Sequence, residues 1–274
     1  MTDKIQPTRQ RVKKFHQFVH VEKGPVNAAI IDLLRGNVFQ VEKDIIEKME
    51  KGAVDEISDF MEAAAEAGLI IEVKPDTWIP ENKLDPAPTD KETEEDINLE
   101  VHVEEGVDLE AVLQKFAGPL LRKLVYYGPP RPDIQFDQEN IKLEHREKDF
   151  RECMKMASVD EDFNRITHSS YLFNRRFNSC WGRKIAVTAD GKIRPCIHSE
   201  ICAADFNTVS PDRLLEIMNE YWGLAKDKVE TCKDCELRHI CFDCREIAQR
   251  EGGGDLRAPN RHCRYDPYNG TWKH

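Results

Sequence analysis

The sequence of 274 residues predicts an α+β protein, and two observations carry this prediction. Short apolar stretches with strand and helix signals alternate along the first half of the chain. The cysteines belong to the second half: none of the nine lies in the first 152 residues, and eight fall between positions 180 and 263. We therefore expect a winged-helix-like module at 12–79, a linker at 80–96, a short α/β segment at 97–167 and a cysteine-rich module at 168–274.

The N-terminal module is expected to combine short strands with two helices. A turn-rich trio, Arg35-Gly36-Asn37, separates two apolar stretches and predicts a hairpin. Farther on, apolar residues recur at helical spacing, and Gly68 ends that pattern. The expected order is a strand within 15–21, hairpin strands at 28–34 and 38–41, helices at 45–49 and 55–67, and a strand at 69–73.

The linker at 80–96 contains three prolines and many acidic residues, which is typical of an extended, solvated chain. The residues after it predict one βαβ unit, with strands at 97–105 and 120–127 and a helix at 108–116. Residues 138–162 are strongly charged and predicted to be partly helical, with Cys153 as a core thiol.

Charge and hydropathy exclude several classes of partner. The 40 basic and 51 acidic side chains leave a net charge of −11, which argues against nucleic acid, because such binding needs a basic surface. No apolar run approaches the roughly 18–20 residues of a membrane-spanning helix. The charged start of the chain has no apolar stretch behind it, so we expect a cytoplasmic protein without a secretory signal. In that reducing compartment, clustered cysteines are typical of metal ligands.

The cysteines form two sequence features. Cys180 and Cys196 flank an alternating stretch with Asp190-Gly191 at its centre, which predicts a hairpin that brings the two thiols together. Farther along, the pattern C-x2-C-x5-C-x2-C places four thiols within thirteen residues, at Cys232, Cys235, Cys241 and Cys244, with Cys263 after them. A helix is expected between the two features, with Ser210 as its N-cap and Pro211 at its first position.

This spacing favours iron–sulfur clusters over zinc. A zinc ribbon separates its two CxxC pairs by about 15–20 residues, whereas five residues separate them here. Dense cysteine runs with two-residue gaps are typical of cubane clusters, in which each thiolate reaches one corner. Seven thiols therefore suit two clusters, with zinc or an unmetallated group of thiols as the alternatives. His239 and His262 lie inside these motifs, and we expect them to hydrogen-bond to cluster sulfurs.

The order of these residues, including the G-x4-C step from Gly191 to Cys196, resembles the SPASM domain of radical-SAM peptide maturases. The stretches NSCWGRKIAVTADGKIRPC and VETCKDCELRHICFDCRE are most similar to the maturase of grasp-with-spasm systems, over about residues 168–272. One gap departs from that pattern, since two residues precede Cys244 where the family has three. The resemblance implies two auxiliary 4Fe-4S clusters, one on Cys232, Cys235, Cys241 and Cys263, the other with three ligands from Cys180, Cys196 and Cys244.

The fourth ligand of the second cluster is left open by the resemblance. Cys202 and His198 are the local candidates, and an iron open to a substrate atom is the alternative. The radical-SAM motif CxxxCxxC is missing from the sequence, and residues 97–179 hold only two or three βα units of about 30 residues each. The resemblance therefore implies a truncated or pseudo radical-SAM protein with a partial barrel.

The order of strands, hairpin and helices in the N-terminal module is similar to the peptide chaperone of pyrroloquinoline quinone biosynthesis. That resemblance implies binding of a leader peptide by strand addition, with residues 38–41 as the accepting strand and the helix at 55–67 as the adjoining wall. A winged helix used for packing or dimerisation is the alternative. The helix at 55–67 carries acids and no Lys or Arg, which disfavours DNA reading.

The sequence therefore predicts an accessory iron–sulfur protein of peptide maturation. It would bind a precursor peptide and present it to, or relay electrons for, a companion modifying enzyme, such as an ATP-grasp ligase or a radical-SAM enzyme. Two alternatives stay open: a peptide-modifying enzyme that works without S-adenosylmethionine through an open cluster site, and a zinc-stabilised adaptor. The sequence assigns no catalytic residue.

Overall fold

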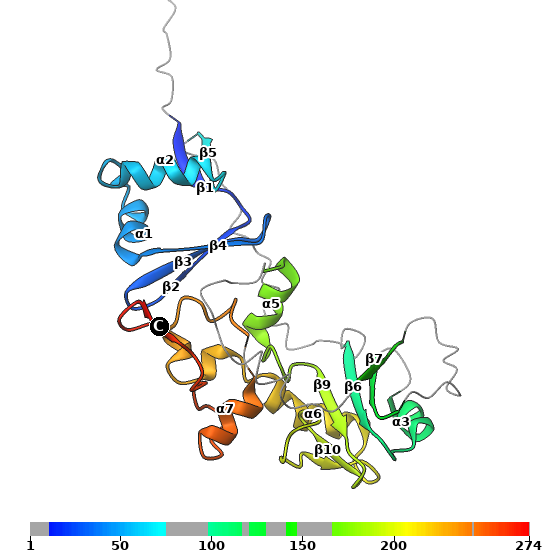
Figure 1. Ribbon diagram of the computed structural model, residues 1–274. Coiled ribbons are helices and arrows are strands. Elements are labelled where there is room, and N and C mark those ends of the chain that lie inside the picture. The colour runs from blue at the N-terminus through cyan, green and yellow to red at the C-terminus, as the bar shows by residue number, and fades with distance from the viewer. Residues whose placement is uncertain are drawn as a thin grey trace, which may run out of the picture.

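The computed structural model describes residues 11–74, 98–116, 121–129, 141–146, 166–242 and 244–273. Their strands form several separate sheets, and helices pack against the larger ones (Figure 1), which confirms the α+β class. The linker at 80–96, Cys153 and most of 138–162 lie outside the described residues. Within the described part of the chain, no helix is long and apolar enough to cross a membrane.

The N-terminal module contains two antiparallel sheets and two helices. One sheet pairs β1 (Val12–Phe15) with β5 (Ile70–Val73). The other has the order β2 (Val19–Lys23), β3 (Asn27–Asp32) and β4 (Asn37–Glu42). The helices are α1 (Lys43–Glu50) and, after a 3₁₀ turn at Val54–Ile57, α2 (Ser58–Glu66). The predicted hairpin, both helices and the last strand are confirmed.

Two details of this module differ from the predictions. The expected strand within 15–21 is split in two, because a turn that is closed by the bond from Val19 N to His16 O separates β1 from β2. In addition, α1 follows β4 without a loop and packs directly against it, while α2 packs against β5. Helix α1 therefore lies directly beside β4, and α2, the helix predicted at 55–67, shares the core on which Val41 of β4 packs.

Strand β3 is buried on both faces of its sheet. Ala28 and Ile30 pack against the helical side, with Ile46 of α1 and Met61 of α2. The alternate side chains, Ala29 and Ile31, pack against the cysteine-rich module, and all four side chains of β3 from 28 to 31 are 0% exposed. In Figure 1 the C-terminal segment accordingly lies next to β2 and β3, on the side away from α1.

A six-stranded sheet joins the middle segment to the cysteine-rich module. Strand β6 (Leu99–Glu104) lies parallel to both β7 (Leu121–Tyr127) and β9 (Lys184–Val187). The full order is β11 (Ala204–Asp205), β10 (Lys192–Arg194), β9, β6, β7 and β8 (Lys142–Arg146). The predicted segments 97–167 and 168–274 thus share one sheet. β8 lies where the sequence predicted a partly helical stretch, and it is a strand because it pairs in parallel with β7 at the sheet edge.

Helices cover one face of this sheet. Leu109 and Val112 of α3 (Leu109–Phe116), together with Met218 and Trp222 of α6 (Pro211–Trp222), pack with strand residues in one core. The predicted cap of α6 is confirmed, since Ser210 Oγ accepts a hydrogen bond from Arg213 N at 3.3 Å. The opposite face carries polar side chains and borders the loop after β10, where Ile197 packs on Val125 and Tyr127.

Candidate metal centre

All eight described cysteines are free thiols. Seven of them lie in two parts of the cysteine-rich module, which we treat as two groups. We call Cys180, Cys196 and Cys244 the three-cysteine group. The pKa of Cys180 is raised chiefly by a hydrogen bond between its thiol and that of Cys244, and also by burial. The charge of Cys196 raises the pKa of Cys180 further. The structure therefore brings together three thiols that are up to 64 positions apart in the sequence.

Short local structures position these three thiols. Cys180 follows α5 (His168–Arg176) in a turn, in which the buried Asn178 Oδ1 accepts hydrogen bonds from Cys180 N and Trp181 N, at 2.9 and 2.8 Å. Cys196 lies just after the β9–β10 hairpin, whose turn uses Gly191 at φ +73°, as the sequence predicted. Burial raises the pKa of the Cys196 thiol to about 12, although a bond from His198 N at 3.3 Å opposes that rise.

The other four thiols, the four-cysteine group, comprise Cys232, Cys235, Cys241 and Cys263. Burial raises the pKa of Cys263, and the charge of Cys232 adds to the rise. Burial also raises the pKa of Cys235, with a further contribution from the charge of Cys241. Because Cys235 and Cys263 also pack against the same hydrophobic cluster, the four thiols lie in one region of the cysteine-rich module.

Lys226 lies beside the four-cysteine group. Its side chain is buried, and its Nζ donates a hydrogen bond to Cys241 Sγ at 3.2 Å. Its positive charge also acts on Cys235 and Cys263, where it opposes the rise in pKa. A buried ammonium is costly unless it has a charged or polar partner, and Cys241 Sγ supplies one.

The N-terminal sheet covers the four-cysteine group. Cys235 and Cys263 pack in the same cluster as Ala29, Ile31 and Leu33. The buried Glu22 of β2 reaches across this contact, since its Oε1 accepts from Tyr171 Oη at 2.7 Å and bonds to His239 Nδ1 at 2.8 Å. Burial raises the pKa of Glu22, but the bond from His239 and the charges of His239 and Arg238 outweigh it and hold the pKa below its usual value.

The two histidines of the cysteine motifs bond to carboxylates. His239 lies between Glu22 and Asp227, with its Nε2 3.1 Å from Asp227 Oδ1. His262 Nε2 lies 2.8 Å from Glu251 Oε1. Both ring nitrogens of His239 thus bond to carboxylates, which are stronger acceptors than sulfur, and this contradicts the expected bond from His239 to a cluster sulfur. For His262, whose shown bond uses Nε2, the expectation stays a prediction.

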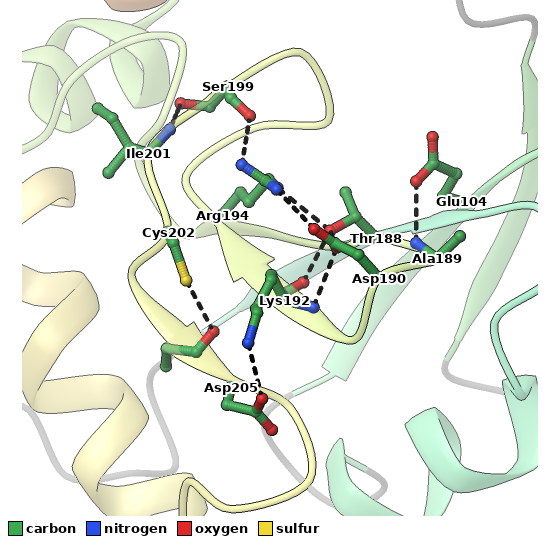
Figure 2. Close-up of polar contacts among 11 residues, drawn as sticks. Glu104, Thr188, Ala189, Asp190, Lys192, Arg194, Ser199, Ile201, Cys202 and Asp205 are labelled. Carbon is green, nitrogen blue, oxygen red and sulfur yellow. Dashed lines mark hydrogen bonds and ion pairs between the residues drawn. The ribbon is translucent and has the colours of Figure 1, made fainter.

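Cys202 and His198, the two predicted candidates for a fourth ligand, have different surroundings. Cys202 is exposed, and its thiol donates to the carbonyl of Ala204 at 3.6 Å, as Figure 2 shows. The bond to Asp205 raises the pKa of Lys192, and burial raises the pKa of Tyr221. The charge of Cys202 adds a smaller rise to both pKa values. His198 is attached to the three-cysteine group through its backbone, since His198 N bonds to Cys196 Sγ and His198 O accepts from Arg250.

A carboxylate that the sequence did not single out lies beside the three-cysteine group. Glu246, in the first turn of α7 (Arg245–Glu251), is 1% exposed. Burial raises the pKa of Glu246, and the charge of Cys244 raises it further. Hydrogen bonds from Ser199 and Arg250 lower this pKa, but they do not outweigh burial. The charge of Glu246 in turn raises the pKa of Cys196. In the sequence, the only sign that Glu246 could belong to the site is an acidic residue between Cys244 and the apolar pair Ile247-Ala248.

An open cleft of about 590 Å³ adjoins the three-cysteine group. It is lined by Glu104 at the end of β6 and by residues next to Cys196, among them Ile197, His198 and Ser199. In Figure 2, Arg194 spans the rim, with bonds to Asp190 Oδ2 at 2.8 Å and Ser199 O at 3.1 Å. A second cleft of about 580 Å³ shares Glu104 and Ala189 with the first. Both lie at the carboxyl ends of parallel strands, where sheets of this kind commonly bind ligands.

The donor chemistry of both groups suits a soft metal. Thiolates select zinc, copper(I) and iron–sulfur clusters. Across the described ranges, no three His, Cys, Asp or Glu side chains lie close enough to surround a single metal ion. Ligands of one zinc ion lie about 4 Å apart, since each Zn–S bond is about 2.3 Å, whereas the irons of a cubane hold its thiolates farther from one another.

Comparison of the chain with protein-family models, with curated proteins and with solved structures finds no match.

Proposed function

We propose that this chain is an iron–sulfur protein of peptide maturation that holds two 4Fe-4S clusters, one on each cysteine group. The observation that carries the proposal is the arrangement of seven cysteines, from separate loops, in two groups whose thiols act on one another. Bound as thiolates, they would supply four ligands to one cluster and three to the other. The clusters would supply one-electron redox chemistry.

The surroundings of the four-cysteine group support a structural or electron-relay role. The N-terminal sheet and the buried Tyr265 pack beside Cys235 and Cys263, and Cys241 is buried, so part of this group is shielded from water. The buried Lys226 ammonium would offset negative charge of a thiolate-ligated cluster. Water exclusion and hydrogen bonds to sulfur are the means by which proteins set cluster potentials.

The N-terminal module would bind the precursor peptide by strand addition to β4. Among the described residues, β4 pairs with β3 alone, so its outer edge is available for a further strand. Phe39, on this edge strand, is 36% exposed and lies opposite Ile30, whose side chain faces the helices. A peptide at this edge would lie beside α1, and Phe39 would contact it.

Because the sequence lacks CxxxCxxC, a companion enzyme in the cytoplasm would modify the peptide. This chain would act for that enzyme as a peptide carrier or an electron relay. The cleft beside the three-cysteine group favours a second candidate function, in which the chain itself modifies the peptide without S-adenosylmethionine. A zinc-stabilised adaptor is the alternative without redox chemistry.

Metal analysis of the full chain, purified without oxygen, tests the iron–sulfur proposal. We expect about eight irons and eight sulfides per chain, because each cubane holds four of each. One or two zinc ions without sulfide would contradict the proposal and support the adaptor.

Peptide binding is tested with short peptides encoded beside this chain's gene. Phe39→Ala should weaken binding about tenfold, since an aromatic contact in an interface is worth roughly 1–2 kcal/mol. The matched control is Val54→Ala, which alters a side chain of similar exposure, 40%, outside β4. Equal affinities for both variants would exclude β4 as the accepting strand. A change in peptide mass without any companion enzyme would favour the second candidate function.

A further inference from the structure

The three-cysteine group leaves one corner of a cubane without a thiolate. Four irons need four ligands, and the group provides Cys180, Cys196 and Cys244. Cys202, one of the two candidates from the sequence, points its exposed thiol at a backbone carbonyl. A further side chain near the group that can bind iron is the carboxylate of Glu246.

Glu246 is buried, and one of its two oxygens has no partner. The residue is 1% exposed, and its Oε2 is a buried atom without a hydrogen bond. A buried carboxylate normally has both oxygens bonded, because leaving a polar atom unsatisfied in the interior costs about 1–3 kcal/mol. The free Oε2 is therefore an oxygen donor that is ready for a ligand.

The other oxygen of Glu246 is fixed by the protein. Arg250 Nε, one helical turn along α7, donates to Oε1 at 2.6 Å, and Ser199 hydrogen-bonds to the same carboxyl group. Ser199 Oγ is itself held by Ile201 N at 3.2 Å, a contact drawn in Figure 2. Outer partners of this kind orient a metal ligand and restrict it to one free oxygen.

The carboxyl group of Glu246 lies near two of the three thiols. Glu246 is two residues after Cys244, and the Glu246 carboxyl acts electrostatically on both Cys244 and Cys196. Ser199, which hydrogen-bonds to Glu246, and His198, whose carbonyl accepts from Arg250, are three and two residues after Cys196. The carboxylate is thus attached to both of the loops that carry these two cysteines.

We propose that Glu246, through Oε2, is the fourth ligand of the cluster held by Cys180, Cys196 and Cys244. The inference rests on the proposed function, because it requires a cluster at the three-cysteine group. The carboxylate donates a lone pair to iron, any proton it carries leaves to solvent, and no oxidation state changes. Because oxygen ligands bind cluster iron more weakly than thiolates do, this corner is the one that a ligand from the adjoining cleft would take over.

The test uses the full chain with Cys232→Ser and Cys235→Ser, so that paramagnetic signals come from the three-cysteine group. The protein is labelled with ¹³C at glutamate carboxyl carbons, reconstituted with iron and sulfide, and reduced. We expect a ¹³C hyperfine coupling to the cluster, measured by electron–nuclear double resonance. This coupling should disappear in Glu246→Gln, and that variant should bind added cyanide at least tenfold more tightly.

Glu251→Gln is the matched control. Glu251 lies on the same helix and also has one oxygen bonded, to His262, and a buried Oε2 without a hydrogen bond. The ¹³C coupling and the cyanide affinity should be unchanged in this variant. Measurement on the unsubstituted carboxyl decides the question even if Glu246→Gln does not fold.

Two results would overturn the inference, and they differ from each other. A reduced cluster without any ¹³C coupling, and with equal cyanide affinity in both variants, would show that Glu246 is no ligand while the proposed function stands. Absence of iron and sulfide from the three-cysteine group would overturn the proposed function itself, and the Glu246 inference with it.

Discussion

Under the proposed function, the buried Lys226 would tune the potential of the cluster on the four-cysteine group. Lys226 is 7% exposed and its Nζ bonds to Cys241 Sγ, so the ammonium would lie within a few ångströms of that cluster. A cluster gains negative charge when it is reduced, and a nearby positive charge stabilises that state. Lys226 is therefore expected to raise the reduction potential.

Replacing Lys226 by Met should lower the midpoint potential of that cluster by on the order of 100 mV, since a unit charge about 5 Å away is worth about 3 kcal/mol at an effective dielectric constant of about 20. A redox titration followed by electron paramagnetic resonance measures the shift. Lys228→Met, an exposed lysine of the same 3₁₀ turn, should leave the potential nearly unchanged. Equal shifts in both variants would contradict the role given to Lys226.

Glu100, His102 and Tyr127 form a buried chain on the polar face of the six-stranded sheet. His102 Nε2 lies 2.6 Å from Glu100 Oε1, and His102 Nδ1 lies 2.8 Å from Tyr127 Oη. Burial raises the pKa of Glu100, but the bond from His102 and the charges of Lys184 and Lys123 outweigh it and lower the pKa to about 2. Burial raises the pKa of Tyr127 to about 12, so its hydroxyl stays protonated and can donate to His102.

The low pKa of Glu100 makes its contribution to stability depend on pH. Since the folded value, about 2, is below the unfolded value of 4.5, the contribution is present above about pH 4.5 and is lost as the pH falls towards 2. Urea unfolding should show Glu100→Gln to be less stable than the wild type by about 3 kcal/mol at pH 7, and by much less at pH 3. The exposed Glu216→Gln should change stability by less than about 1 kcal/mol at either pH. A difference for Glu100→Gln that is constant with pH would refute this account.

At the scale of elements, β3 separates two cores. Ile30 packs with the helices of the N-terminal module, and Ile31 packs with Leu237 and Tyr265 in the cluster that contains Cys235 and Cys263. Both isoleucines are 0% exposed, so their substitution by Ala removes the same number of buried carbons. The two positions differ only in the face of the sheet to which they belong.

Ile30→Ala and Ile31→Ala should each lower the free energy of unfolding by about 3 kcal/mol, within the range for large-to-small core substitutions. Only Ile31→Ala should open the four-cysteine group, so that a chelator removes its iron several-fold faster than from the wild type. Chelation followed by absorbance measures this rate. Faster loss from Ile30→Ala than from Ile31→Ala would contradict the assignment of the two faces.

Helices and strands that are marked by turn or cap residues in their own sequence could be predicted. Strands that form only because they pair with a segment far away in the sequence could not. The Asp190-Gly191 turn specifies the hairpin, and Ser210-Pro211 specifies the start of α6. The charged β8 carries no strand signal of its own and is a strand because β7 lies beside it. For the same reason, the sequence could not show that β9 joins β6 in one sheet.

At the scale of the whole molecule, the cysteines were visible in the sequence but their surroundings were not. Seven thiols lie near one another in two parts of the cysteine-rich module, and the two clusters that the resemblance implied stay a prediction. Glu22 contacts His239 across 217 positions of sequence. Lys226 and Glu246 look like ordinary charged residues of a charged chain until folding buries them beside sulfur.

Two paired variants test the central claim, that the cysteines hold two separate clusters. Iron, sulfide and reduced-state resonance spectra are measured on Cys180→Ser/Cys196→Ser and on Cys232→Ser/Cys235→Ser, with the exposed Cys202→Ser as control. Each paired variant should lose about four of about eight irons, together with one of two signals, while the control keeps all of them. Loss of all the iron from both paired variants, or zinc in place of iron, would contradict the claim.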